Sequence, residues 1–182
     1  MAPYAHLVGP VPEGADPDEY DRARRRVLWK LPSGLYLLGS RSGERRNLMT
    51  CNWVTQLATE PKLLGVGVEV GVHTYGLVRE GGAFTLSLLA REDRGLVRKF
   101  VKPAEHDPRA RTLNGVAYRD AAVTGAPVPG PAVAFLDCRL ERELPFGSHS
   151  LFVGEIVDAG FADGGEEAEV LRMEDTRMSY GG

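Results

Sequence analysis

Short apolar runs, each about as long as a β-strand and bounded by glycine, proline or polar turns, recur from residue 34 to residue 157. They constrain the fold more than any other feature, because runs of this length suit strands better than core helices. Many short strands with few short helices predict a mainly β chain, a β-barrel with α-helical additions. The predicted strands cover residues 35–38, 47–53, 63–68, 83–89, 133–141 and 150–157.

Three segments predict short helices. Asp16 is a suitable N-cap for a helix over residues 17 to about 26, in which acidic residues come first and basic residues last. A second helix is expected over residues 75–80, where two glycines follow and can end it. A third is expected over residues 93–102, because Pro103 disfavours its continuation.

With 182 residues the chain is long enough for one domain with a sizeable core. We expect an N-terminal arm over residues 1–16, the barrel domain over 17–162 and a C-terminal tail over 163–182. Residues 104–131 are rich in proline and show little periodicity. Because a structureless loop of that length is uncommon, part of this region should carry order or function.

Charge and cysteine content restrict the partners and the compartment. The formal net charge is −3, and arginines alternate with acidic residues, which argues against nucleic acid or an anionic membrane as a partner. Cys51 and Cys138 are far apart and form no CxxC motif, so a reducing cytoplasm is expected. No apolar run is long enough to span a bilayer, and the four histidines lack metal-ligand spacing, so no metal site is predicted.

The segment from Val70 to Tyr75 joins a predicted strand to a predicted helix. Free backbone N–H groups and the positive end of the helix dipole suit such a point to a phosphate. Thr74 adds a hydroxyl donor there, and His73 can add a second donor. The alternative is that Thr74 only caps the helix.

The segment from Asn47 to Thr55 offers groups for a flat aromatic ligand. The Asn52 amide both donates and accepts, as the pyrimidine edge of a flavin requires. Trp53 offers an aromatic surface, while Thr50 and Thr55 can reach polar atoms of the ligand. The alternative is that Trp53 is a core residue of an ordinary strand. Cys51, within the same strand, is expected to be an inert small apolar residue.

His149 follows Gly147 in a tight turn just before a predicted strand, which can aim its imidazole at the barrel rim. A surface histidine in a turn is the alternative. The glycines between residues 65 and 71 do not form a dinucleotide fingerprint, because they fall inside an apolar strand. The three clusters together suggest a flat ring system with a phosphate tail, and flavin mononucleotide (FMN) is the leading candidate.

In chain order, three segments resemble the flavin reductase-like family, whose members bind FMN in a split β-barrel with a Greek-key-like topology. The first resembles the ring-facing strand and the turn after it, the second the phosphate-side helix, and the third the Gly-Asp-His segment and closing strand. The resemblance covers roughly residues 30 to 160. The matching segments are residues 47–64, 73–84 and 147–157.

The resemblance assigns site residues. Four would face the isoalloxazine ring, partly through backbone groups, and Thr55 would lie beside the cofactor; three would lie near the ribityl phosphate. His149 would stand at the flavin edge where nicotinamide arrives. Two departures are Lys62 in place of the family's second proline and Ser148 in place of its aspartate. The ring-facing residues are Thr50, Cys51, Asn52 and Trp53, and the phosphate-side residues are His73, Thr74 and Tyr75.

The resemblance also implies an activity. The protein would be a homodimer that binds FMN, with FAD as a second possibility, and transfers hydride from NADH or NADPH to the flavin. In this family reduced flavin often passes to a separate monooxygenase, which makes such an enzyme a possible partner. The terminal segments outside the common core could cover the partner subunit's site. The alternatives are an electron-transfer flavoprotein that retains FMN without nicotinamide turnover and a non-catalytic barrel.

Overall fold

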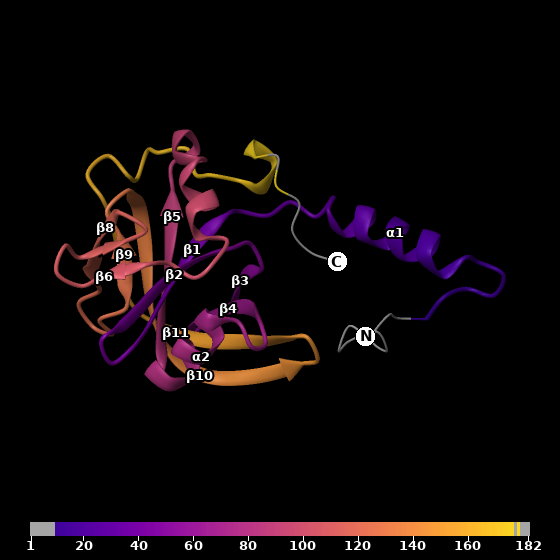
Figure 1. The fold of residues 1–182 in the computed structure, drawn as a ribbon, viewed down its shortest axis with the longest axis horizontal. Helices are drawn as coiled ribbons and strands as arrows, with labels where there is room; N and C mark the ends of the chain where they lie inside the picture. Colours follow the sequence, from indigo (N-terminus) through magenta and orange to yellow (C-terminus); the bar gives the residue numbers. More distant parts are fainter. Residues whose placement is uncertain (1–9, 177, 179–182) are drawn as a thin grey trace.

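The computed structural model describes residues 10–176 and residue 178, and its main feature is a seven-stranded antiparallel sheet (Figure 1). Its spatial order is β2-β1-β5-β10-β11-β4-β3, and the edge strands β2 and β3 are not paired with each other in the described part. This open, strongly bent sheet confirms the prediction of a mainly β fold. The strands are β1 (Tyr36–Ser42), β2 (Arg45–Cys51), β3 (Val54–Thr59), β4 (Lys62–Glu69), β5 (Ala83–Leu89), β10 (Ala132–Phe146) and β11 (His149–Phe161).

The first two strands, both predicted from the sequence, form a hairpin with Gly43 in the left-handed region at its turn (φ 57°). Strand β2 ends at Cys51, earlier than expected, because the chain bends at Asn52 and Trp53. The Val54 N–H donates to the Asn52 carbonyl at 3.1 Å. Strand β3 was not predicted as a separate strand. As a mostly exposed edge strand, it lacks the apolar pattern that marks the others.

Residues 104–131 contain a second, four-stranded sheet, so the expectation that this region carries order is confirmed. The sheet lies against the larger one, where the Thr85 hydroxyl donates to the Pro127 carbonyl at 2.6 Å. Gly39 of β1 faces the same carbonyl, and its lack of a side chain permits the close approach. The strands are β6 (His106–Asp107), β7 (Thr112–Leu113), β8 (Val116–Asp120) and β9 (Pro127–Pro129).

Helix α1 (Pro17–Leu28) is confirmed and extends away from the sheets (Figure 1). Helix α2 (His73–Gly81) is also confirmed, and Gly82 ends it in the left-handed region with φ 64°. The predicted third helix is instead two 3₁₀ segments, η2 (Arg91–Asp93) and η3 (Leu96–Phe100). In η3 the fully buried side chains are three residues apart, which suits the three-residue repeat of a 3₁₀-helix.

The core occupies both faces of β1, because Leu37 packs in one apolar cluster and Leu38 in the other. Burial on both faces explains why this strand is a continuous apolar run instead of an alternating one. Leu171, in the segment assigned to the tail, belongs to the first cluster and is 1% exposed. Its N–H donates to the Leu89 carbonyl at 2.9 Å. The expected division into arm, barrel and tail stays a prediction.

Two further features concern membranes and metal ions. In the described part of the chain, no helix is long and apolar enough to cross a membrane. The same residues contain no group of three or more His, Cys, Asp or Glu side chains placed to share a metal ion.

We expect Gly39→Ala to destabilise the fold, since a Cβ atom there would lie 2.1 Å from the Pro127 carbonyl oxygen. Overpacking of this kind costs about 1–3 kcal/mol in the free energy of unfolding, measured by urea denaturation. Gly76→Ala is the matched control, because a Cβ atom at that helical position has no neighbour within 4 Å. Equal urea midpoints for the two variants would contradict the close packing of the two sheets.

Candidate functional site

A groove of about 1150 Å³ lies where the bend between β2 and β3 meets the segment after α1 and the C-terminal segment. Three of the predicted site residues line it, and seven further polar or aromatic residues join them from other parts of the chain. The predicted ones are Asn52, Trp53 and Thr55, and the others are Trp29, Lys30, Ser33, Tyr36, Arg172, Glu174 and Thr176.

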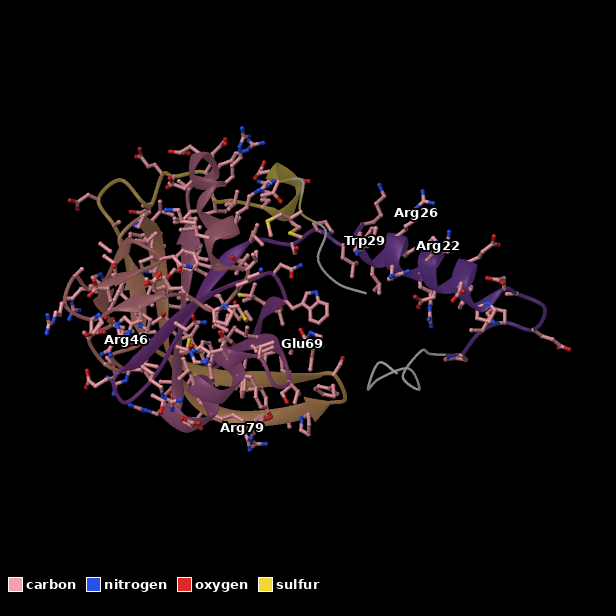
Figure 2. All side chains as sticks on the ribbon, viewed as in Figure 1. Arg22, Arg26, Trp29, Arg46, Glu69 and Arg79 are labelled. Carbon is pink, nitrogen blue, oxygen red and sulfur yellow. The ribbon has the colours of Figure 1, made fainter. Side chains whose placement is uncertain are left out.

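The groove has aromatic walls. Trp29 and Trp53, the two tryptophans of the chain, both line it and remain 48% and 41% exposed. Trp29 lies at the base of α1, beside the barrel (Figure 2). Exposed large apolar side chains that gather in a hollow mark a binding site or an interface. Aromatic faces of this kind can stack on a flat ring.

Polar groups lie between these walls. Asn52 is 8% exposed, and its Nδ2 donates to the Ser33 hydroxyl at 3.4 Å. Tyr36 packs over Gly34, where a Cβ atom would lie within 2.1 Å of the phenol oxygen. Burial, with a smaller effect from Cys51, raises the pKa of Tyr36 above its ordinary value. Its phenol therefore stays neutral and able to donate at physiological pH.

Two cations extend into the same groove. Lys30 follows Trp29, and Arg172 comes from the C-terminal segment, whose backbone pairs with Gly34. An Arg172 Nη1 atom lies 3.3 Å from a carboxylate oxygen of Glu174, and both side chains are mostly exposed. An exposed pair of this kind is weak, so the guanidinium can exchange this carboxylate for another anion at little cost.

Trp53 also forms a wall of a second hollow of about 390 Å³, and His149 lies there. The two ring centroids are 4.6 Å apart with a tilt of 49°. Strand pairing explains why the two rings are in contact. Strand β11 begins at His149, opposite Glu69 of β4, and the N–H of Gly67, on the same strand β4, donates to the Trp53 carbonyl. The structure therefore brings His149 to the groove residues through Trp53.

His149 is positioned by its neighbours. The Ser148 hydroxyl lies 2.9 Å from its Nδ1 atom, in the place of the family's usual carboxylate. Desolvation lowers the pKa of His149, and the charge of Glu69 opposes that shift. The lowered pKa leaves the imidazole neutral at pH 7, with one nitrogen able to donate and the other able to accept.

Thr50 and Cys51 do not line the groove. The Thr50 hydroxyl donates to the Val97 carbonyl at 2.6 Å, inside the core. Cys51 is also buried, and desolvation raises the pKa of its thiol to about 12. The expectation that Cys51 is an inert apolar residue fits this environment. The assignment of both residues to the ring face, partly through their backbone groups, stays a prediction.

The three phosphate-side residues form the first turn of α2, and none of them is among the described residues that line the two hollows. Thr74 is buried, and its hydroxyl accepts from the Asn47 amide at 2.8 Å. The helix begins after Val72, so the alternative of Thr74 as its N-cap is wrong. The Tyr75 hydroxyl donates to Glu143 at 2.7 Å, whereas the His73 side chain is exposed.

The sequence analysis missed Trp29, Lys30, Tyr36 and Arg172. Each of them lies outside the polar clusters that were singled out, and no local spacing relates them to Asn52. The sequence shows that Trp29 directly follows a capped helix, but the direction in which its side chain points depends on how the chain enters β1. Arg172 reaches the groove because Leu171 is anchored in the core.

Comparison with known proteins agrees with this geometry. The chain matches the flavin reductase like domain over residues 28–181. It is 33% identical over 156 residues to a ferric-chelate reductase (NAD(P)H) of Archaeoglobus fulgidus, covering 84% of this chain and 88% of that protein. It is 27% identical to the reductase component of 4-hydroxyphenylacetate 3-monooxygenase of Thermus thermophilus, covering 79% and 87%.

The fold agrees as well. The NADH:FAD oxidoreductase of Streptomyces globisporus C-1027 superimposes with a TM-score of 0.73 at 25% identity, over 90% of this chain and 93% of that one. Together the family match, the relatives and the fold place the chain in the class of flavin-dependent oxidoreductases. The chain belongs to the flavin reductase family, so the resemblance, the split barrel and the enzyme class predicted from the sequence are confirmed.

We expect both thiols to be unreactive in the folded protein. Burial raises the pKa of Cys138 as well as that of Cys51 to about 12, so only about one thiol in ten thousand is ionised at pH 8. Ellman's reagent at pH 8 should modify the native protein more slowly than the same protein in urea by about a thousandfold or more, because a free thiol of pKa about 8.5 is roughly one quarter ionised at that pH. Rapid modification of Cys51 in the native protein would show that the groove reaches its thiolate.

Proposed function

We propose that this flavin reductase binds FMN in the groove and transfers hydride to it from NADH or NADPH. One observation carries the proposal: Asn52 and both tryptophans converge on one groove, and His149 stands against Trp53 at its edge. The family membership supports flavin as the ligand. The groove also has room for FAD, which carries two phosphates. We favour FMN, which carries one, because Lys30 and Arg172 are the only cations among the described residues that line the groove.

The residues of the groove suit the parts of FMN. Trp53 and Trp29 offer faces for the isoalloxazine ring, and the Asn52 amide can pair with its pyrimidine edge. The Thr55 hydroxyl, exposed on β3, can reach a polar atom of the ribityl chain. Bound FMN supplies hydride acceptance from nicotinamide at N5. The protein's part is to orient the two rings and exclude water from them.

The phosphate has two candidate anchors. The sequence-based assignment is the first turn of α2, with His73, Thr74 and Tyr75. Lys30 and Arg172 favour a second place, because they line the same groove as Trp53 and carry charge of the right sign. The Thr74 hydroxyl accepts from Asn47 and keeps its own proton for donation, but Thr74 is only 1% exposed, which leaves its oxygen poorly accessible to a phosphate. We therefore favour the two cations as the anchor.

His149 is the candidate catalytic residue. Its neutral imidazole, held by Ser148 and tilted against Trp53, can donate to the flavin or orient the arriving nicotinamide. No covalent step is needed, and the burial of Cys51 argues against its thiol as a nucleophile.

We further propose a homodimer in the cytoplasm that supplies reduced flavin to a separate monooxygenase. The similar reductase component from Thermus thermophilus supports such a partner. Two buried free cysteines are in keeping with a reducing compartment.

Flavin binding should quench nearly all of the intrinsic tryptophan fluorescence, because both tryptophans line the groove. Titration of the protein with FMN, excited at the indole band, measures this directly. Trp53→Phe should keep quenching of the remaining Trp29, and Trp29→Phe should keep quenching of Trp53. A tryptophan whose emission survives saturation with FMN does not face the cofactor.

Asn52→Ala and His149→Ala should separate binding from hydride transfer. We expect Asn52→Ala to weaken FMN affinity about tenfold through loss of its hydrogen bonds. His149→Ala should leave FMN affinity within about twofold and slow anaerobic flavin reduction by NADH about tenfold or more. Gln56→Ala is the matched amide control, because Gln56 lies on β3 and bonds to Ala58 instead of lining the groove. Equal FMN affinities for all three variants would contradict the placement of the ring beside Asn52.

A further inference from the structure

Helix α1 has nothing of its own barrel to pack against. It extends away from both sheets (Figure 1), and none of the described residues of this 12-residue helix is buried. Isolated helices of this length are marginal in water, and most helical stability in proteins comes from packing of an apolar face. The Asp16 cap and the Asp21–Arg24 ion pair help locally, but each contributes little. Packing on a surface outside its own barrel would therefore stabilise the helix further.

The helix carries a face suited to packing. Tyr20, Ala23 and Val27 are spaced three and four residues apart, which places them in one stripe. Val27 is 69% exposed. Arg22 and Arg25 fall on the opposite side by the same periodicity. Figure 2 shows Arg22 well away from the barrel, whereas Trp29 lies at the base of the helix.

Further exposed apolar residues surround the groove at the base of this arm. Leu31 is 68% exposed on the groove, and Phe146, on the second hollow, is 67% exposed. The groove of about 1150 Å³ also exceeds the roughly 300–1,000 Å³ of typical ligand pockets. It therefore has space for a covering segment in addition to a cofactor.

The arm cannot cover its own groove with this stripe. Its last residue, Leu28, is at the groove, and the helix runs from there into solvent for about 18 Å. A second copy of the chain has the matching features: an uncovered groove and an arm that points outward. Under two-fold symmetry each arm can lie on the other copy, which satisfies both surfaces at once.

We propose that α1 of one copy packs through its Tyr20–Ala23–Val27 stripe on a second copy of this chain, along the rim of the groove. Each groove is complete only when the partner's arm covers it. The exchange of arms rests on the geometry of α1 alone, whereas the effect on the cofactor rests on the proposed function. The arm excludes water from the groove, which strengthens polar contacts inside it.

Val27→Glu tests the proposal in the full-length protein, with Arg22→Gln as the matched control. Both variants lower the net charge by one, but only the first places a charge on the stripe. A buried unpaired carboxylate weakens association by about tenfold or more per arm, hence about a hundredfold for two symmetric arms. Sedimentation velocity measures the dimer dissociation constant, and FMN fluorescence titration measures cofactor affinity. Thermal unfolding checks that both variants fold, as the exposure of both sites predicts.

We expect Val27→Glu to weaken both the dimer and FMN binding, and Arg22→Gln to change neither. A monomeric wild-type protein, or a Val27→Glu dimer as tight as wild type, would overturn the exchange of arms. A weaker dimer that binds FMN with wild-type affinity once it is fully assembled would overturn the covering of the groove. A wild-type dimer that binds no FMN refutes the proposed function instead, and the sedimentation result still decides the exchange.

Mixing two variants tests whether the arm acts on the partner. Val27→Glu has an intact groove and a defective arm, while Trp53→Ala has an intact arm and a defective groove. At concentrations that assemble dimers, an equimolar mixture should regain tight FMN sites, up to about a quarter of the wild-type number under random exchange of subunits. FMN binding equal to the sum of the separate variants would show that each arm acts on its own groove and would overturn the proposal.

Discussion

The site depends on one backbone contact, the hydrogen bond from the Gly67 N–H to the Trp53 carbonyl at 2.9 Å. It holds the bend between β2 and β3 against β4. A Cβ atom on Gly67 would lie 3.2 Å from the Trp53 ring, so glycine lets the indole lie close to the strand. Held in this way, Trp53 becomes a wall of both the groove and the hollow that contains His149.

Strand pairing supplies the other half of the site. Because β4 pairs with β11 in antiparallel register, Glu69 lies opposite His149 at the start of the closing strand. The imidazole then meets Trp53 although the two residues are far apart in the chain. A register shift of one residue would turn His149 to the other face of the sheet and separate the rings.

Much of the fold was predictable because its signals are local. Strands such as β1 and β5 are buried on both faces, so their apolar runs stand out from the polar turns, and the Asp16 cap marks the start of α1. The sequence pattern failed to predict elements that are little buried or whose repeat is not that of an α-helix. Strand β3 is an exposed edge, and η3 buries side chains at a spacing of three instead of a helical period.

The amino-acid sequence by itself determined the family, the mainly β fold and three of the groove residues, Asn52, Trp53 and Thr55. It could do so because ordered polar clusters beside strands form a pattern along the chain. Only the tertiary structure decided that Trp29 and Arg172 join this groove, and that the hydroxyls of Thr50 and Thr74 are engaged elsewhere. These outcomes depend on which way a bend turns and which strands pair, and those are set by contacts between residues distant in sequence.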